Sequence, residues 1–235
     1  MTFDDLVVGK SNEQAVIACR LMAEGKNKGI NPLYVYGFSG VGKTTLLNCV
    51  YEHADGQPLY ISAKYWADEY IRMIHENDNY SLSKLFKEYD LIIVDDVDWF
   101  DDKEATSEAF LQYLKLTLNC GKRMIISGNV HPMDLMNMNC GIKRRLLEGL
   151  VCQIKAPGKK MRYEYLLRLS ESFDVKVSEE VIELVSKLAD TNFFVLHGIF
   201  NYVVAMYTCS ERKNSDKKIL KQIPDLVMRA MYGEM

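Results

Sequence analysis

A glycine-rich segment at residues 37–44 constrains the fold of this chain more than any other feature. Its sequence, Gly-Phe-Ser-Gly-Val-Gly-Lys-Thr, fits the pattern G-x-x-x-x-G-K-[ST] of a phosphate-binding loop. A strand-like apolar run at 33–36 precedes the loop and a helical stretch at 44–50 follows it, which is the context that the pattern needs. The alternative is a glycine-rich turn that fits the pattern by coincidence.

The loop predicts a site for a nucleoside triphosphate and Mg²⁺. Its glycines let successive backbone N–H groups turn towards a polyphosphate, and the N-terminus of the following helix adds a partial positive charge. Lys43 would reach the outer phosphates, and the hydroxyl of Thr44 would bind Mg²⁺. The other loop residues that we predict to bind the cofactor are Gly37, Gly40, Val41, Gly42 and Thr45.

A second segment supports the same site. Residues 91–94 form a continuous apolar run, as expected of a strand buried on both faces of a parallel sheet, and the run ends in Asp95 and Asp96. We predict that Asp95 holds the hydration shell of Mg²⁺ and that Asp96 orients and activates the attacking water. The alternative is a solvated acidic turn, because Asp98 and two further aspartates follow closely.

The composition limits the classes of function. With 235 residues and 48% apolar residues, the chain suits one large domain or a medium domain with a small one. Its net charge of -3, from 29 basic and 32 acidic residues, excludes a globally basic nucleic-acid binder. Any contact with DNA must therefore come from a local patch.

The cysteines and the hydropathy indicate a cytoplasmic protein. No C-x-x-C spacing is present, so the sequence predicts neither a zinc site nor a redox pair. No signal peptide and no apolar run near 18 residues is visible, so we expect no membrane span. A reducing compartment suits six scattered cysteines, which are Cys19, Cys49, Cys120, Cys140, Cys152 and Cys209.

Strands that alternate with helices predict an α/β fold with a parallel sheet of about five strands covered by helices. The pattern breaks at 156–158, and only helices follow, so we predict an α/β nucleotide-binding domain at 1–157 and a small helical lid domain at 158–235. The expected strands are 33–36, 58–61, 90–95, 123–127 and 150–154. The expected helices begin near 11–14 and then cover 44–50, 64–76, 81–88, 104–119, 142–148, 159–172, 178–189, 192–209 and 216–231.

Four collinear segments give the chain a resemblance to AAA+ ATPases and, among them, to the bacterial replication initiator DnaA family. They are residues 2–12, 31–37, 90–100 and 106–110. The resemblance implies a P-loop AAA+ fold that binds Mg-ATP, hydrolyses it and assembles in an ATP-dependent way during the initiation of DNA replication. The first segment lines the adenine pocket in that family, which implicates Val8 and Gly9.

Two further roles follow from the resemblance. Asn129 lies where the first sensor sits, at the end of a strand beside the γ-phosphate; relatives in the DnaA family commonly carry Asp there, and AAA+ proteins at large carry Asn. The alternative for Asn129 is a turn residue before Pro132. Arg145 lies at the position of the arginine finger, which reaches the nucleotide of a neighbouring subunit. The alternative is one of three basic residues on a solvated helix face, 143–145.

The chain departs from the family pattern in three places. Phe194 stands where relatives carry the second-sensor Arg, and a phenyl ring cannot neutralise phosphate charge, so we expect slow turnover. Gly141 stands where relatives carry another Arg that supports subunit contacts. The sequence ends at Met235 without the basic helix-turn-helix domain of the full initiators, so it represents an excised module or a short relative.

Single-stranded DNA is a candidate partner. The resemblance aligns residues 64–88 with two short helices that touch single-stranded DNA, and it places Ile71, Arg72 and Lys103 on or beside contact positions. A further basic position of the family is Ala105 here. The alternative is that Ile71 is core and Lys103 an ordinary surface lysine. We expect Tyr65, Trp66 and Tyr70 to be packing residues.

Three functions remain open at this point. The chain could be an initiator-type ATPase that self-associates through its ATP interface. It could instead be a regulator or loader that uses Arg145 to act on an initiator or a helicase partner. The third alternative is a catalytically weak binding module that a nucleotide stabilises, which Phe194 favours and the intact Lys43, Thr44, Asp95 and Asp96 oppose.

Overall fold

The computed structural model describes residues 2–26, 29–76, 88–173, 175–209 and 215–232. These residues divide into two units. Unit 1 comprises residues 1–6, 12–38 and 42–154, and unit 2 comprises 7–11, 39–41 and 155–235. The helix expected at 81–88 lies almost entirely outside the described residues.

Unit 1 is built on a five-stranded sheet in which every neighbouring pair of strands is parallel, as predicted. The order of the strands is β2-β3-β4-β1-β5, so three strands lie inside the sheet and two lie at its edges. Every residue of β3 is buried, which is why its sequence is a continuous apolar run. The strands are β1 (Leu33–Tyr36), β2 (Pro58–Ser62), β3 (Leu91–Asp95), β4 (Arg123–Gly128) and β5 (Leu150–Gln153).

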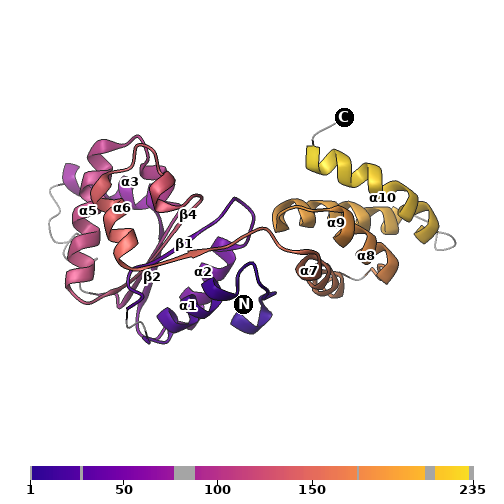
Figure 1. The fold of residues 1–235 in the computed structure, drawn as a ribbon, viewed down its shortest axis with the longest axis horizontal. Coiled ribbons are helices and arrows are strands. Elements are labelled where there is room, and N and C mark those ends of the chain that lie inside the picture. Colours follow the sequence, from indigo (N-terminus) through magenta and orange to yellow (C-terminus); the bar gives the residue numbers. More distant parts are fainter. Residues whose placement is uncertain (1, 27–28, 77–87, 174, 210–214, 233–235) are drawn as a thin grey trace. The chain divides into compact units, whose positions relative to one another are not determined.

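Helices cover both faces of this sheet (Figure 1). On one face lie α1 (Glu13–Ala23) and α2 (Lys43–His53), which contact each other and the strands β1, β3 and β5. On the other face lie α3 (Ala63–His75), α5 (Glu104–Asn119) and α6 (Cys140–Glu148). Three short 3₁₀ helices complete the described part of the unit: η1 (Phe3–Asp5), η2 (Val97–Phe100) and η3 (Pro132–Asp134).

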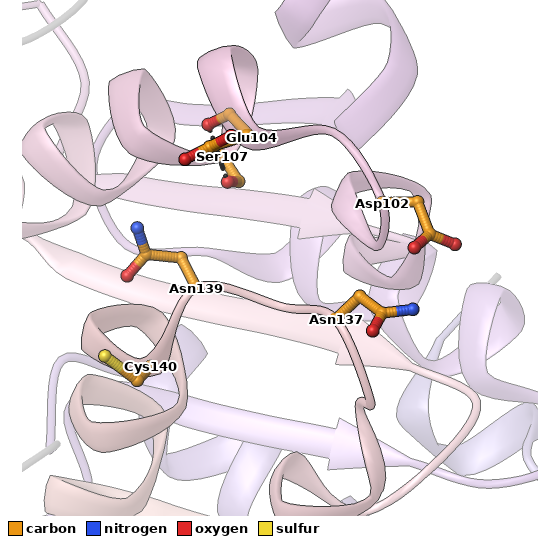
Figure 2. A pocket seen from close by; sticks show the side chains of 6 residues that line it. All are labelled: Asp102, Glu104, Ser107, Asn137, Asn139 and Cys140. Atoms are coloured by element: carbon orange, nitrogen blue, oxygen red, sulfur yellow. Dashed lines mark hydrogen bonds between the residues drawn. The ribbon is translucent and has the colours of Figure 1, made fainter.

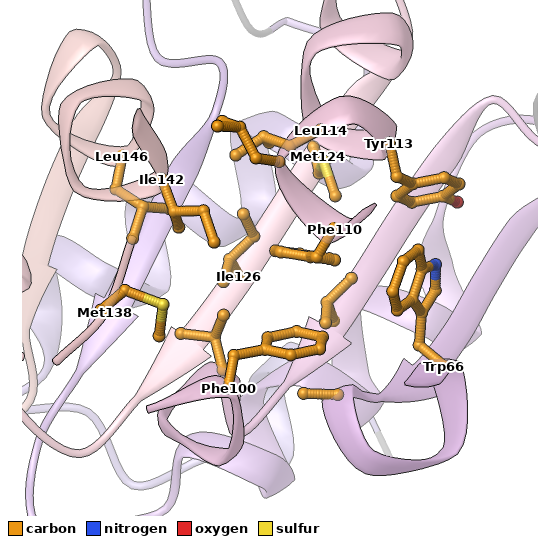
Figure 3. Close-up of a cluster of buried hydrophobic side chains, with 14 of the residues drawn as sticks. Trp66, Phe100, Phe110, Tyr113, Leu114, Met124, Ile126, Met138, Ile142 and Leu146 are labelled. Atoms are coloured by element: carbon orange, nitrogen blue, oxygen red, sulfur yellow. The ribbon is translucent and has the colours of Figure 1, made fainter. Parts of the chain in front are cut away.

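An aromatic cluster fills the space between α3, α5, α6 and the sheet (Figure 3). Phe100 and Phe110 stack with their ring centroids 4.5 Å apart, and Trp66 meets Phe110 edge-on at 5.2 Å. Ile126 and its neighbours on alternate positions of the strands form the floor of the cluster, since alternate side chains point to the same face of a sheet. This core fixes η2, and therefore the residues that follow Asp96, against the sheet.

Arg123, the first residue of β4, ties two distant helix ends to the sheet. Its side chain is buried, with 8% of the residue exposed. One guanidinium nitrogen donates to the carbonyl oxygens of Met22 and Ala23 at 2.7 and 2.8 Å, at the end of α1. The other donates to the carbonyl of Asp55, which follows α2. A cation at the C-terminal carbonyls of a helix also interacts favourably with the helix dipole.

Unit 2 contains the four helices predicted after residue 158. They are α7 (Lys159–Glu171), α8 (Glu179–Leu188), α9 (Phe193–Cys209) and α10 (Ser215–Tyr232), and Leu166, Val185, Phe200 and Ile223 lie in their common core. None of the helices that the structure describes in either unit combines the length and the apolar character needed to cross a membrane.

Candidate functional site

The strand order of unit 1 gathers the predicted site at one edge of the sheet. The glycine-rich loop follows β1, Asp95 ends β3, and Asn129 follows β4. These three strands are neighbours in the order β3-β4-β1, and the carboxyl ends of parallel strands meet at the same edge. The loop, the carboxylates and the amide therefore converge, although they lie far apart in the sequence.

The loop adopts a backbone that requires glycine. Gly40 and Gly42 have φ angles of 77° and 101°, in the left-handed region that other residues rarely adopt. Gly42 directly precedes α2, so the loop leads into the N-terminus of that helix. This is the arrangement in which backbone N–H groups and a helix dipole favour an anion.

Lys43 is held inside the site as a buried cation. Only 6% of the residue is exposed, and burial lowers the pKa of its ammonium group. Its Nζ donates to the carbonyl oxygen of Gly37 at 2.7 Å and to Oδ1 of Asn129 at 2.9 Å. The predicted phosphate contact and the predicted first sensor are thus within one hydrogen bond of each other.

Asp95 accepts hydrogen bonds from three hydroxyl groups. Thr44 Oγ1 donates to Oδ2 at 2.9 Å, Tyr60 Oη donates to the same oxygen at 2.5 Å, and Ser127 Oγ donates to Oδ1. A threonine hydroxyl beside a carboxylate supplies the hard oxygen atoms that Mg²⁺ prefers, so these residues fit the metal. Sequence reasoning missed Tyr60 and Ser127, although a polar residue near the carboxyl end of an apolar strand is a usable signal.

Asp96 directly follows β3 in a left-handed conformation, with φ 59° and ψ 54°. Its backbone N–H donates to Ser127 Oγ at 2.9 Å, and the residue is only partly exposed to solvent. Partial burial, and after it the charge of Asp95, raises the pKa of the Asp96 carboxyl group. A raised pKa makes a carboxylate a better proton acceptor, and its role as a general base remains a prediction.

Asp98 belongs to the site, although the sequence also allowed a solvated acidic turn. Its side chain is half-buried, and burial raises the pKa of its carboxyl group. Its Oδ2 accepts from the backbone N–H of Asn129 at 2.7 Å and from Nδ2 of the same residue at 3.1 Å. The approach is close because Gly128 has no side chain: a Cβ there would lie 2.0 Å from Oη of Tyr34 and 3.2 Å from Oδ2 of Asp98.

Several predicted residues belong to unit 2. Val8 is exposed, and Gly9 lies against Met161, whose sulfur would be 2.6 Å from a Cβ at position 9. Within the same unit, the backbone N–H of Phe193 donates to the carbonyl of Gly40 at 2.9 Å. Phe194, at the second-sensor position, leaves 78% of its surface exposed.

Arg145 lies on α6 in an ion pair with Glu148, at 2.7 Å, and its side chain is 36% exposed. Arg144 pairs with the other oxygen of Glu148 at 3.2 Å and is 82% exposed. Gly141, upstream on the same helix, packs against Leu111, whose Cδ2 would be 2.5 Å from a Cβ at position 141. A larger side chain at position 141, where the resemblance implies an Arg, would have to displace the end of the Leu111 side chain. A finger role for Arg145 remains a prediction.

A polar pocket of about 370 Å³ lies at the start of α6 (Figure 2). Its lining residues come from the start of α5, the start of α6 and the segments before them: Asp102, Glu104, Ser107, Asn137, Asn139 and Cys140. None of these is a predicted site residue. The described part of the chain contains no group of three His, Cys, Asp or Glu side chains that could hold a metal ion.

The candidate DNA contacts lie on α3 and beside η2. Ile71 is 42% exposed, so its alternative assignment to the core is wrong, and Arg72 beside it forms an ion pair with Glu69. Lys103 is engaged locally: its Nζ lies 4.2 Å from the centre of the Trp99 ring and donates to the Trp99 carbonyl at 2.7 Å.

The packing role expected for three aromatic residues of α3 holds for two of them. Trp66 is buried in the core, and Tyr70 stacks on it. Tyr65 is 58% exposed, so the prediction was wrong for this residue.

Comparison with known proteins identifies the family to which the chain belongs. Residues 1–153 match the bacterial DnaA ATPase domain family. The chain is 31% identical over 231 residues to the chromosomal replication initiator protein DnaA of Zymomonas mobilis, an alignment that covers 96% of this chain and 48% of that protein. The chain thus spans about half the length of the curated relatives it matches.

Solved structures share the fold. Domain III of the replication initiation protein DnaA from Thermotoga maritima superposes with a TM-score of 0.84 at 24% identity, over 96% of both chains. A replication initiator DnaA bound to AMPPCP and single-stranded DNA superposes with a TM-score of 0.79 at 21% identity, over 98% of this chain and 72% of that one.

Proposed function

Because this chain belongs to the family of bacterial DnaA ATPase domains, we propose that it binds Mg-ATP, hydrolyses it slowly and acts in the cytoplasm in the initiation of DNA replication. One observation carries the proposal. Lys43 donates to Asn129, and Thr44 donates to Asp95, at a single edge of the sheet. The groups that we propose to bind phosphate, to hold the metal and to sense the nucleotide are therefore within reach of one another.

Each residue has a defined part in this proposal. Lys43 exchanges its bonds to the backbone carbonyls of Gly37 and Phe38 for the outer phosphates of ATP and keeps its bond to Asn129. Thr44 and Asp95 hold Mg²⁺, which supplies positive charge to the phosphates when bound. Asp96 accepts a proton from the attacking water and orients it. Asn129 contacts the γ-phosphate or that water.

A turnover experiment tests the enzymatic part. Wild-type protein, Lys43→Ala and Asp96→Asn are compared for ATP binding by calorimetry and for phosphate release. We expect Lys43→Ala to lose binding, and Asp96→Asn to bind ATP and to lose turnover by about 10²-fold or more, the scale of an acid–base contribution. Turnover unchanged by both substitutions would refute the site.

The proposal includes ATP-dependent self-association, with Arg145 reaching the nucleotide of a neighbouring subunit. Arg145 is partly exposed and pairs with Glu148 on its own helix, so a short side-chain rearrangement would free its guanidinium. A guanidinium stabilises the charge that develops during phosphoryl transfer. Val8 and Gly9 contribute to the adenine pocket in this proposal.

Light scattering in ATP and in ADP tests assembly. We expect the mass to grow in ATP, Arg145→Ala to abolish the growth and Arg144→Ala to preserve it. Arg144 is the matched control because it pairs with the same Glu148 and is more exposed. A monomer in both nucleotides would refute self-assembly and favour the second candidate, a regulator or loader that acts on an initiator or helicase.

The exposed second-sensor position favours one further candidate. Phe194 places a large apolar side chain in solvent where relatives have an Arg. If wild-type protein binds ATP and gains thermal stability from it, but releases no phosphate over many hours, the chain is a binding module that the nucleotide stabilises.

Single-stranded DNA is part of the proposal as a partner. Ile71 is exposed, Arg72 adjoins it on α3, and Lys103 directly precedes α5. An apolar side chain beside cations is a common way to grip single strands. Anisotropy of a labelled oligo-dT tests it: Ile71→Ala should weaken ATP-dependent binding, whereas Ile17→Ala, which alters an exposed apolar residue on α1, should not.

A further inference from the structure

The Asn129 amide is held between a cation and a carboxylate. Lys43 has only donors and lies 2.9 Å from Oδ1 of Asn129. The carboxylate of Asp98 has only acceptors when ionised and lies 3.1 Å from Nδ2 of Asn129. Each neighbour, taken alone, specifies the same orientation of the amide, with its oxygen towards Lys43.

The backbone reinforces this orientation. The N–H of Asn129 donates to the same Oδ2 of Asp98 at 2.7 Å, so one carboxylate oxygen fixes both the main chain and the side chain of Asn129. Asp98 is itself fixed, because η2 packs through Phe100 into the aromatic core and the carbonyl of Asp98 accepts from the N–H of Asp101 at 2.9 Å. The absence of a side chain at Gly128 permits the close approach.

We propose that Asp98 is a positioning residue that holds the oxygen of the Asn129 amide towards Lys43, so that Asp98 and Asn129 act as one sensing unit. This inference rests on the proposed function for its nucleotide and deepens the role of the same site. It predicts that two carboxylates at positions 98 and 129 destabilise the fold and that an amide at either position relieves this repulsion.

A double-mutant cycle tests the pairing without any ligand. Asn129→Asp places two carboxylates in contact, and we expect the unfolding midpoint at pH 7.5 to fall by about 5 °C or more. The fall should shrink at pH 5, because one carboxylate of such a pair is readily protonated. The double variant Asp98→Asn/Asn129→Asp should recover part of the loss, since it removes the contact between two carboxylates, while the amide oxygen at position 98 still accepts from the backbone N–H of residue 129 and Lys43 donates to the new carboxylate.

The matched control lies on the same turn. Oδ1 of Asp101 accepts from the backbone N–H of Asn137 at 2.8 Å, so Asp101→Asn alters a comparable carboxylate that faces another segment. The double variant Asp101→Asn/Asn129→Asp should show no recovery. Equal midpoints for Asn129→Asp with and without Asp98→Asn, or equal recovery with Asp101→Asn, would overturn the proposal.

Nucleotide affinity supplies the second readout. Asp98→Ala removes the oxygen that accepts both hydrogen bonds from Asn129. We expect the affinity of this variant for Mg-ATP, measured by calorimetry, to fall by about 5- to 30-fold, the range of one or two hydrogen bonds at about 1 kcal/mol each. Asp98→Asn should stay within a few-fold of wild type, since its amide oxygen accepts the same bonds. Wild-type affinity in Asp98→Ala would overturn the proposal. Failure of the wild-type protein to bind ATP would instead refute the proposed function, while the cycle of midpoints would still decide the pairing.

Discussion

Replacing Arg123 by Met should destabilise unit 1 far more than removing the neighbouring charge of Lys122. Methionine fills much of the volume of the arginine stem and removes the guanidinium. That group donates to the carbonyls of Met22, Ala23 and Asp55, and the residue is only 8% exposed. The substitution therefore removes a charged donor from three carbonyl groups, of which that of Ala23 keeps the bond from the backbone N–H of Asp55 at 2.8 Å.

The magnitude follows from these contacts. A hydrogen bond from a charged donor contributes about 1.5–3 kcal/mol net, and the cost of burying the guanidinium offsets part of the sum. Removing the donor of a buried carbonyl costs about 1–3 kcal/mol, which we adopt for Arg123→Met because no charge is left unpaired. At about 2–4 °C per kcal/mol for a chain of this size, the midpoint should fall by roughly 2–12 °C.

Tryptophan fluorescence during urea unfolding is a suitable assay. The two tryptophans of the chain, Trp66 and Trp99, both belong to unit 1, so the signal follows that unit. Lys122→Met is the control: Lys122 precedes Arg123 and pairs with an exposed Asp90 at 3.6 Å, a contact of the kind that contributes about 1 kcal/mol or less. Equal losses for Arg123→Met and Lys122→Met would refute the reasoning.

Three other substitutions give separate tests. Tyr60→Phe removes one of three donors to Asp95. We expect it to lower the free energy of unfolding in urea by about 1–2 kcal/mol and to raise several-fold the Mg²⁺ concentration needed for half-maximal ATP binding. Tyr51→Phe alters the ring packed edge-on against Tyr60 and should leave the Mg²⁺ requirement unchanged. Because the pKa of the Asp96 carboxyl group is raised, its ionisation costs more free energy in the folded state than in the unfolded chain. Asp96→Asn should therefore raise the unfolding midpoint at pH 7, and the gain should shrink to nothing near pH 4. A gain independent of pH would contradict the raised pKa of Asp96. Phe194→Arg should speed phosphate release and change the unfolding midpoint little, since Phe194 is 78% exposed. Unchanged turnover would show that the lack of a cation at position 194 does not limit hydrolysis.

The local parts of the site were predictable from the sequence because they are encoded within short segments. The loop at 37–44 carries its own glycines, its cation and its helix start, and β3 is recognisable as an apolar run that ends in two carboxylates. A parallel sheet buried on both faces produces such runs repeatedly, so its five strands and the helices that lie within the described residues could be placed.

The lateral contacts could not be predicted, because they depend on strand order and register. Tyr60 and Ser127 reach Asp95 only because β2 and β4 flank β3. In the sequence, Asp98 is one of several closely spaced aspartates, and only the positions of η2 and Gly128 bring it to Asn129.

Two more residues illustrate why a local pattern is not enough. Arg123 has partners 68 to 101 positions away, and all of them are backbone carbonyls, which carry no signal in a sequence. Tyr65 was expected to pack, but Trp66, Tyr70 and Met73 occupy the inward stripe of α3, and Tyr65 lies one position off it.

The order of the strands also sets how the site would respond to partial opening of the sheet. The loop follows β1, Asp95 ends β3 and Asn129 follows β4; these three strands lie inside the sheet, while β2 and β5 lie at its edges. Edge strands open more readily than central ones, so amide hydrogens of β2 should exchange with solvent well before those of β3 and β4. Such fraying would break the hydrogen bond from Tyr60 to Asp95, while those from Thr44 and Ser127 to Asp95 would remain. Asp95 would therefore lose its hydrogen-bond donors one at a time.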